Sequence, residues 1–361
     1  MKAAVLNQIG DTKLELRDDV RTTDVGPREI RVRVRATGVC HSDLSAMDGT
    51  LPALAPGIIG HEGAGEVVEA GPQVDHLAVG DHVALTFVPP CGTCVNCRGG
   101  RPHLCAIHSI AAFMNPRFLI GDTPVFGYAG TGTFAEELVV PADGAVKVAD
   151  DVPFEIAALV ACGVMTGVGA AINTAKVSPG ASVLVIGCGG VGISVIQGAR
   201  LAGAATIVAV DPVVGKHETA KHFGATHAVT PEQLAETNAT LTENQGWDYT
   251  FDVVGAPATI RSAWDNARRG GTVVVVGAGR GDAMVSFSAQ ELFLHDKRLL
   301  GSFYGGADVH RDYPRLLSLW RSGRLDLEGM ISKRITLDEI NDGLQALRAG
   351  GNLIRQIVTF G

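Results

Sequence analysis

The sequence predicts a two-domain α/β protein, in which a β-rich half with irregular, mainly antiparallel strands precedes a doubly wound parallel sheet. Three observations support this fold class. Short alternating segments broken by glycine and proline fill residues 1 to about 153, a glycine-rich turn joins an apolar strand to a helix within residues 181–200, and strand-like and helix-like segments then alternate. A chain of 361 residues is also longer than one compact core usually needs, so two domains are expected.

The strands of the first half are short. Residues 30–35 alternate apolar and polar side chains with a period of two, as expected of a strand with one buried face. Gly26-Pro27, Gly71-Pro72 and Pro89-Pro90 mark turns between such segments. We therefore expect a mainly antiparallel sheet from which a cysteine-rich lobe projects.

This lobe contains four of the seven cysteines, in the spacing C-x2-C-x2-C-x7-C: Cys91, Cys94, Cys97 and Cys105. Four thiolates at this spacing can close a tetrahedral shell around zinc and leave no position for a substrate, which is the arrangement of a structural site. Unrelated reduced thiols and an iron–sulfur cluster are the alternatives, and the clustering favours zinc over both. His103 could replace one thiolate, although the set of four is complete without it.

Candidate ligands for a second metal ion lie in three separate segments, at Cys40, at His61 with Glu62, and at Cys162. Two thiolates and one imidazole leave a fourth coordination position open, as in a catalytic zinc site that polarises an alcohol or carbonyl oxygen. Each residue taken alone is explained equally well as a buried core cysteine or a hydrogen-bonded core histidine. The remaining cysteine, Cys188, is expected to be a small buried filler.

The clearest cofactor signal is an apolar strand at residues 181–186 that ends in G-x-G-x-x-G and leads directly into a helix. In that geometry the pyrophosphate of a dinucleotide meets backbone N–H groups at the helix N-terminus. A second strand, at 206–210, ends at Asp211, nineteen residues past the last glycine. An acid there binds the adenosine ribose hydroxyls and repels a 2′-phosphate, so the pattern predicts NAD rather than NADP. The glycines of the turn are Gly187, Gly189, Gly190 and Gly192.

Later segments extend the parallel sheet and then leave it. Residues 249–254 and 271–276 are strand-like, residues 313–320 and 337–347 have helical periodicity, and residues 354–360 indicate a closing strand. We expect the last segment to return to the first domain, so that a cleft between the domains holds zinc and nicotinamide. The expected boundaries are 1–163 for the first domain, 164–303 for the dinucleotide-binding domain and 304–361 for the returning segment.

Composition excludes several classes of partner. Charged residues make up 19% of the chain, the formal net charge is −8 and there is no basic block, so neither nucleic acid nor an anionic membrane is an expected partner. We expect no signal peptide and no segment that is apolar over the length of a membrane span. Seven cysteines in such a chain indicate metal ligands rather than disulfides, which favours a cytoplasmic protein.

The three ligand segments, the four-cysteine lobe and the glycine turn, in this order, make the chain resemble the medium-chain zinc-dependent alcohol dehydrogenases over essentially its whole length. The motifs G-H-E-x-x-G, C-x2-C-x2-C-x7-C and G-x-G-G-V-G are jointly specific to that family. The resemblance implies a GroES-like catalytic domain, a Rossmann domain that binds NAD, and two zinc ions per subunit, one catalytic and one structural. It also implies the interconversion of alcohols with aldehydes or ketones by hydride transfer.

The resemblance assigns roles around the catalytic metal. Cys40, His61 and Cys162 match its zinc ligands, and Glu62 matches a glutamate that can approach the metal during ligand exchange. Asp43 matches the carboxylate that fixes the tautomer of the zinc-bound histidine.

Ser42 matches the hydroxyl that takes the alcohol proton. In some relatives the proton relay ends at a histidine, whereas this chain has Ser45 there. Serine has no titrating imidazole, so water or another base must complete the relay.

The resemblance also implies contacts with the cofactor: Thr166 and Val191 with the nicotinamide, Asp211 and Lys216 with the adenosine ribose, and His41 and Arg355 with the pyrophosphate. His41 stands where many relatives carry arginine. It is therefore expected to hold the diphosphate less firmly and to hasten the release of NADH.

The implied substrate pocket is lined by Leu51, Phe87, Ile110, Tyr128, Ala129, Val276 and Ala278. These side chains leave room for a branched or aromatic primary alcohol. A thiol-dependent formaldehyde dehydrogenase is the alternative, because residues 162–167 and 171–174 resemble that branch too. Leu51 stands where the glutathione-dependent class carries an acid, which argues against glutathione, whereas Arg117 could still meet an anionic thiol cofactor.

A non-catalytic zinc- and NAD-binding protein is a further alternative. Such relatives are expected to lose Cys40, His61 or Cys162, and all three are present. A zinc-finger nucleic-acid binder is disfavoured by the acidic balance, and quinone reductases of the same superfamily lack both zinc sets. The expected partners are a small-molecule alcohol or aldehyde and further copies of the chain, because the family forms homo-oligomers; the segment after Cys105 leaves dimer and tetramer open.

Overall fold

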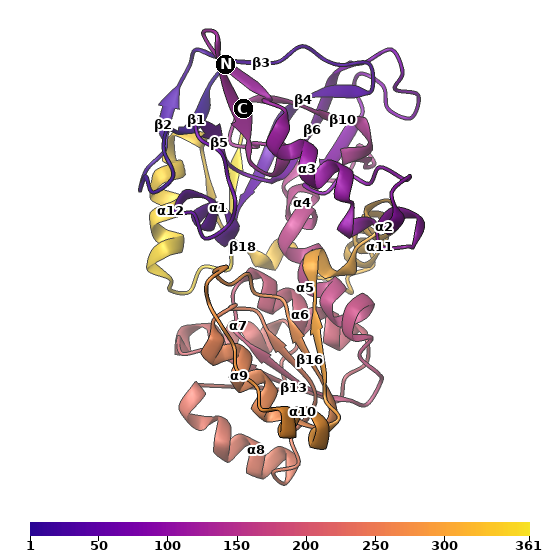
Figure 1. Cartoon of the computed structure of the whole chain (residues 1–361), viewed down its shortest axis with the longest axis vertical. Helices are drawn as coiled ribbons and strands as arrows, with labels where there is room; N and C mark the ends of the chain where they lie inside the picture. The colour runs from indigo at the N-terminus through magenta and orange to yellow at the C-terminus, as the bar shows by residue number, and fades with distance from the viewer. The chain divides into compact units, whose positions relative to one another are not determined.

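The computed structural model describes residues 1–361, except for the side chain of Ser109. The chain forms two compact units, and many of their elements are labelled in Figure 1. The first unit comprises Met1–Cys162 and Asp308–Gly361, and the second comprises Gly163–Ala307. Both ends of the chain therefore belong to the first unit.

The larger sheet of the first unit is made of β4 (Glu29–Val39), β6 (Glu62–Ala70), β7 (His82–Leu85), β10 (Glu137–Pro141), β11 (Ala145–Lys147), β18 (Ile331–Ile335) and β19 (Arg355–Thr359). The strand order is β11-β7-β6-β4-β19-β18, with β10 also paired to β4. All of these pairs are antiparallel except that of β18 with β19. In β4, Ile30, Val32 and Val34 are buried while the arginines between them are not, which confirms the predicted alternation.

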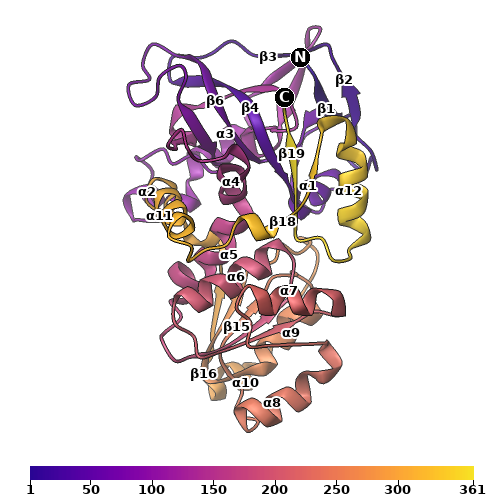
Figure 2. The same cartoon turned by 180° about the vertical axis from the view of Figure 1, so that it is seen from behind.

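The end of the chain completes this sheet. β19 pairs antiparallel with β4, from Gln356 opposite Val39 to Thr359 opposite Ala36. Figure 2 shows the yellow β19 beside β4. The closing strand predicted at residues 354–360 is therefore confirmed.

A second sheet of the first unit consists of β1 (Ala3–Leu6), β2 (Glu15–Arg17), β3 (Val20–Thr22), β5 (Gly57–Ile58), β8 (Phe118–Ile120) and β9 (Thr123–Gly127), in the order β2-β1-β5-β9-β8-β3. Buried side chains from both sheets form one hydrophobic core, in which Ile30, Phe118 and Phe134 are fully enclosed. Burial of such apolar area is the main stabilising contribution to the unit.

The helices of the first unit are α1 (His41–Met47), α2 (Val95–Arg98), α3 (Ala106–Met114), α4 (Phe154–Leu159), α11 (Val309–Arg321) and α12 (Ile340–Ala349), with short turns η1 (Pro102–Leu104), η2 (Tyr128–Gly130), η3 (Ala142–Gly144), η9 (Glu328–Met330) and η10 (Leu337–Glu339). The helix predicted at 313–320 lies within α11, and the one predicted at 337–347 comprises η10 and most of α12. Tyr313 of α11 is fully buried and its hydroxyl donates a hydrogen bond to the carbonyl oxygen of Leu85, at 2.5 Å.

The second unit contains a parallel six-stranded sheet of β12 (Ser182–Ile186), β13 (Thr206–Val210), β14 (His227–Val229), β15 (Trp247–Asp252), β16 (Ala267–Val275) and β17 (Arg298–Gly301). The order β14-β13-β12-β15-β16-β17 places the first and fourth strands side by side. This is the order of a Rossmann sheet, with a topological switch point between β12 and β15. The predicted doubly wound parallel sheet is confirmed.

The helices and short turns of this unit are α5 (Met165–Gly169), η5 (Ala170–Ala175), α6 (Gly190–Leu201), η6 (Val214–Lys216), α7 (His217–His222), η7 (Pro231–Gln233), α8 (Leu234–Thr242), α9 (Pro257–Asn266), α10 (Ala289–His295) and η8 (Phe303–Gly306). Trp247 and Trp264 are buried in a core with apolar side chains of β12 and β13. The indole N–H of Trp247 donates a hydrogen bond to Oδ1 of Asn238 on α8, at 2.6 Å.

One apolar helical stretch was not expected from the sequence. Phe154–Ala175 is long and apolar enough to cross a membrane by length and composition, so the expectation that no segment reaches that length was wrong. The stretch runs through α4, the π-helical turn η4 (Val160–Val164), α5 and η5. Its most apolar window is 89% buried inside the protein, as in the core helix of a globular fold.

Candidate active site

Three segments that are far apart in the sequence meet at one end of the ladder between β4 and β6. Gly38 of β4 pairs with Glu62 of β6, so Cys40 and His61 lie at the same end of these strands. α4 contacts both strands and continues into η4, which contains Cys162. One ligand atom from each of Cys40, His61, Glu62 and Cys162 lies within 4.8 Å of the others, and all four residues are buried.

Asp43 of α1 ties two of these segments together. Its Oδ1 accepts hydrogen bonds from His61 Nδ1 at 2.9 Å and from the backbone N–H of Gly60 at 3.2 Å. Its Oδ2 accepts from the backbone N–H of Cys40 at 2.8 Å. Because a carboxylate only accepts hydrogen bonds, Nδ1 of His61 carries a proton and Nε2 is left to bind a cation.

The donor set fits zinc. Within the described part of the chain, His61 Nε2 is buried without a hydrogen-bond partner, which a bound cation would supply. Burial lowers the pKa of His61, but the carboxylate of Asp43 and the thiolate of Cys40 outweigh it and raise that pKa to about 10. A metal ion at Nε2 replaces this proton. Two thiolates and one imidazole are the ligands of a catalytic zinc with one open position.

Glu62 forms a buried ion pair with Arg355 of β19. The two residues lie on the strands either side of β4: Glu62 is the partner of Gly38 on β6, and Arg355 lies on β19 two residues before Ile357, the partner of Gly38 on that strand. A Cβ at Gly38 would collide with the carboxylate of Glu62 and would lie 2.8 Å from Nη2 of Arg355, so the glycine leaves space for the pair. Sequence reasoning named both residues but did not pair them, because no local pattern relates positions this far apart.

Two aromatic rings lie edge-on to the imidazole of His61. The centroid of Phe87 is 5.4 Å from that of His61, with a 90° angle between the planes. Tyr128 lies at 5.5 Å and 88°. Burial, with a smaller effect from the charge of Asp43, raises the pKa of Tyr128, so its hydroxyl stays protonated and can donate a hydrogen bond. The sequence named both residues as pocket positions but not their contact with a candidate metal ligand.

The other predicted pocket residues are spread over both units. Leu51 is half-buried, and its backbone N–H donates to the carbonyl oxygen of Ser45 at 2.9 Å. Ile110 lies on α3 with 65% of its surface exposed, and Ala129 has a φ of 52° in the turn η2. Val276 and Ala278 follow β16 in the second unit.

The start of α1 carries the three other predicted side chains near Cys40. His41 is the first residue of this helix and is exposed, whereas Ser42 and Ser45 are half-buried. Ser42 therefore lies two residues from the candidate ligand Cys40 in the chain and one residue before Asp43.

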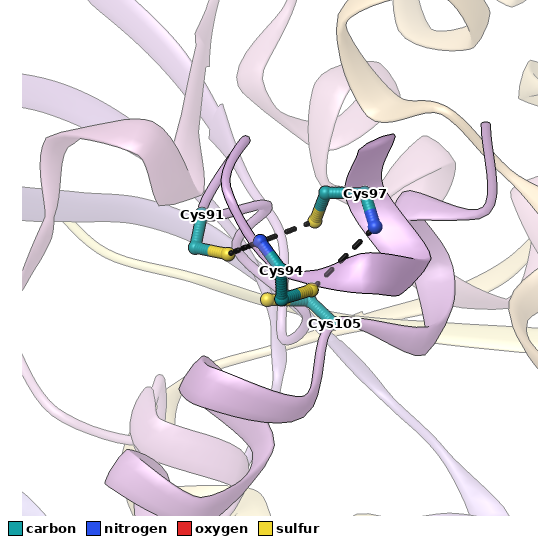
Figure 3. A group of neighbouring side chains, drawn as sticks. All are labelled: Cys91, Cys94, Cys97 and Cys105. Atoms are coloured by element: carbon teal, nitrogen blue, oxygen red, sulfur yellow. Dashed lines mark hydrogen bonds between the residues drawn. The ribbon is translucent and has the colours of Figure 1, made fainter. Parts of the chain in front are cut away.

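The four-cysteine lobe forms a second cluster, shown in Figure 3, in which the four sulfur atoms lie within 4.8 Å of one another. Cys91 Sγ lies 3.8 Å from Cys97 Sγ. Backbone N–H groups of Thr93, Cys94 and Cys97 donate to the sulfurs of Cys91 and Cys94 at 3.3 to 3.5 Å. Four converging sulfurs with no carboxylate or imidazole among them fit a closed structural zinc site.

These N–H groups stabilise thiolates. Burial raises the pKa of Cys91, but the hydroxyl of Thr93 and the amides of Cys94 and Thr93 outweigh it and lower the pKa to about 6. The pKa of Cys94 is lowered chiefly by the amide of Cys97. Backbone N–H groups of the lobe therefore favour the thiolate form of Cys91 and Cys94, which is the form that binds a metal cation.

In the second unit the glycine turn follows β12 and lies at the switch point of the sheet, where dinucleotides bind in this topology. Gly187 has a φ of 102°, which favours glycine. A Cβ at Gly192 would collide with the carbonyl oxygen of Gly187, whereas Gly189 faces open space. α6 begins at Gly190, so its first N–H groups point toward the turn. These features fit the pyrophosphate of a dinucleotide.

Asp211 directly follows β13 and is 5% exposed. Its Oδ2 accepts a hydrogen bond from the backbone N–H of Cys188 at 2.8 Å, and its Oδ1 accepts from that of Val213 at 2.9 Å. Lys216 Nζ lies 3.5 Å from Oδ2. The structure thus brings together the glycine turn, Asp211 and Lys216, which were predicted to bind one cofactor.

Two smaller assignments concern the same unit. Thr166 lies on α5 and Val191 on α6, and these helices are in contact. Cys188 is fully buried, and burial together with the charge of Asp211 raises the pKa of its thiol to about 12. The thiol therefore stays protonated, as expected of a small filler.

The suggestion that Arg117 meets an anionic thiol cofactor is wrong. Arg117 is 6% exposed, and its Nη1 lies 2.5 Å from Oε1 of Glu29. A buried guanidinium that is already paired with a carboxylate serves the packing of the first unit rather than ligand recognition.

Taken together, the β-rich unit, the Rossmann sheet and the two metal-ligand clusters define a zinc-binding oxidoreductase that uses a dinucleotide. The family model described as "Alcohol dehydrogenase GroES-like domain" matches residues 26–150, and the one described as "Zinc-binding dehydrogenase" matches residues 190–322. The chain belongs to the zinc-dependent medium-chain alcohol dehydrogenase family.

Individual relatives support this assignment. The chain is 36% identical to an S-(hydroxymethyl)glutathione dehydrogenase from Paracoccus denitrificans, over 93% of this chain and 94% of that protein. It is 40% identical to the putative alcohol dehydrogenase D of Mycobacterium tuberculosis, over 92% and 93%. It is also similar to the crystal structure of benzyl alcohol dehydrogenase from Acinetobacter calcoaceticus, with a TM-score of 0.92, 30% identity and coverage of 100% and 99%. The protein is thus an alcohol dehydrogenase with zinc and NAD as its cofactors.

Proposed function

We propose that the protein interconverts primary alcohols that carry an aromatic or similarly bulky group with the corresponding aldehydes. The observation that carries this proposal is the pair of rings, Phe87 and Tyr128, that lie edge-on to His61. Aromatic walls next to the metal ligands favour a flat apolar substrate over ethanol, because each buried ring contributes area and a preferred edge-to-face geometry. The relative that is named a benzyl alcohol dehydrogenase is consistent with this choice.

Zinc, when bound, is the Lewis acid that polarises the oxygen of the alcohol or aldehyde, and NAD accepts the hydride. Cys40, His61 and Cys162 hold the metal, and Asp43 keeps Nε2 of His61 free of a proton by binding Nδ1–H. Glu62 is paired with Arg355 and has a carboxylate oxygen in the same cluster of candidate ligand atoms, so it would be available as a further ligand when a metal is bound.

Ser42 takes the alcohol proton. The half-buried Ser42 is near Cys40 in the chain, and its hydroxyl can both accept a proton and pass one on. Ser45 at the end of the relay has no titrating group, so a water molecule completes the transfer to solvent.

The roles of the predicted domains follow from these assignments. Residues 1–163 with the returning segment 304–361 bind substrate and both metals, and residues 164–303 bind NAD. Arg355 is buried and paired with Glu62, so the predicted contact with the pyrophosphate is assigned to His41, which lacks the bidentate guanidinium fork. A His41→Arg variant is therefore expected to release NADH several-fold more slowly, measured by stopped-flow fluorescence; an unchanged rate would remove His41 from the cofactor site.

The protein acts in the cytoplasm as a homodimer or homotetramer, without nucleic acid or membrane as a partner. The acidic balance of the chain and its seven free cysteines support this view. Sedimentation of the purified protein distinguishes the two oligomeric states, and a monomer would contradict both.

A second candidate is thiol-dependent oxidation of formaldehyde, which the S-(hydroxymethyl)glutathione dehydrogenase relative favours. Leu51 lacks the acid expected of the glutathione-dependent class, and Arg117 is engaged by Glu29. Both features rank this activity below the first.

The decisive test is NADH formation with benzyl alcohol, longer primary alcohols, ethanol, and formaldehyde with and without glutathione. We expect kcat/KM for benzyl alcohol to exceed that for ethanol by about tenfold or more. Phe87→Ala should lower kcat/KM for benzyl alcohol more than for a straight-chain alcohol, whereas Phe293→Ala, at a ring that is 82% exposed, should change neither. Turnover of formaldehyde with glutathione alone would replace the proposal by the second candidate.

A further inference from the structure

His217 is a buried histidine that has no role in the mechanism above. It is the first residue of α7 and is 8% exposed. Its Nε2 lies 2.8 Å from the backbone carbonyl oxygen of Asp211. Because a carbonyl oxygen only accepts hydrogen bonds, Nε2 must carry a proton and donate it, so the contact also determines which ring nitrogen is protonated.

This hydrogen bond closes the loop between β13 and α7. The loop starts at Asp211, whose carboxylate binds the backbone N–H of Cys188 in the glycine turn, and ends at Lys216, the residue before His217. Lys216 Nζ in turn lies 3.5 Å from the carboxylate of Asp211. The side chain of His217 therefore links the backbone of Asp211 to the backbone next to Lys216.

We propose that His217 is a positioning residue that sets the choice of NAD over NADP by holding the backbone of Asp211. This role rests on the use of NAD as the cofactor, and it does not depend on which alcohol is oxidised. It goes beyond the glycine-turn pattern, which singles out the acid but not the side chain that holds it.

The two cofactors should respond in opposite directions. If Asp211 moves away from the adenosine ribose, its hydrogen bonds to the ribose hydroxyls weaken and NAD binds less well. The same movement takes a negative charge away from the position of a 2′-phosphate, so NADP is repelled less. A general loosening of the unit would instead weaken both cofactors alike.

The experiment measures dissociation constants of NADH and NADPH by fluorescence titration of the holoenzyme, without alcohol. For His217→Leu we expect the NADH constant to rise about fivefold and the NADPH constant to fall about twofold. His217→Gln, whose amide nitrogen can reach the position of Nε2, should restore both within about twofold. His222→Gln, at an exposed histidine of the same helix, is the matched control and should change neither.

Two further measurements keep the proposal testable. His217→Asn places its amide nearer the position of Nδ1, so it should behave like the leucine variant even if the latter folds poorly. At saturating NAD, kcat of the variants should stay near that of the wild type while KM for NAD rises. Equal weakening of both cofactors, no rescue by glutamine, or failure of the wild type to bind NADH would each overturn the proposal; the absence of benzyl alcohol turnover would not.

Discussion

The two candidate metal sites of this protein are built in opposite ways. The candidate ligands of the lobe lie within one short segment, residues 91–105, and N–H groups of the same segment stabilise the thiolates of Cys91 and Cys94. The candidate ligands of the other site come from three distant segments and are buried, and Asp43 links two of these segments, at Cys40 and at His61. Local chain geometry suffices for the first site, whereas the second exists only once β4, β6 and α4 have packed. We therefore expect the four-cysteine lobe to determine the stability of the protein and the site at Cys40, His61 and Cys162 to determine its activity.

The largest expected effect is on activity. Cys162→Ser should lower kcat with benzyl alcohol by about a thousandfold or more, because the lost Lewis acid contributes several kcal/mol to the transition state. Zinc content should fall from two ions to one per subunit, and the unfolding temperature should change little. Cys188→Ala, at a buried cysteine outside both clusters, is the control and should keep both ions. Substantial remaining turnover of the Cys162→Ser variant would contradict the assignment of activity to this site.

Removing a ligand of the four-cysteine lobe should have the opposite effect, a loss of stability with little change in activity. Cys97→Ser should also leave one zinc, but it should lower the unfolding temperature by about 5–10 °C, because binding energy of a structural metal is folding energy. The activity per remaining catalytic zinc should stay within about twofold of the wild type. Calorimetry with metal analysis checks this, and an unchanged unfolding temperature would show that the lobe does not stabilise the unit.

Asp43→Asn separates the sites more finely. The amide keeps the size of the side chain but not its charge, so the affinity of the catalytic site for zinc should fall about 10–100-fold. Transfer of zinc to a chelator should show two kinetic phases, one for each site. In the Asp43→Asn variant only the phase of the catalytic site should become faster. Acceleration of both phases would mean that the two sites are energetically coupled.

The smallest effect is expected at Thr93. Its hydroxyl lies 3.5 Å from Cys91 Sγ and supports the thiolate. Thr93→Val should accelerate zinc release from the lobe about threefold, in keeping with the loss of one weak hydrogen bond. The phase that belongs to the catalytic site is the internal control in the same experiment.

Sequence reasoning failed where burial or pairing depends on distant segments. The ion pair of Glu62 with Arg355 crosses β4 at Gly38, and nothing near either residue in the sequence indicates it. Arg117 looked available for an anion because its neighbours in the sequence do not reveal Glu29. The apolar stretch 154–175 was overlooked because polar residues, such as Glu155 and Thr166, interrupt its run of apolar side chains.

The sequence by itself determined the features with short-range causes. Alternation, glycine turns and cysteine spacing predicted the strands, the Rossmann unit and the four-cysteine lobe, because each depends on backbone geometry over a few residues. Only the tertiary structure decided which side chains surround His61 and which one holds Asp211. Those contacts depend on strand register and helix packing, where a shift of one residue turns a side chain to the opposite face.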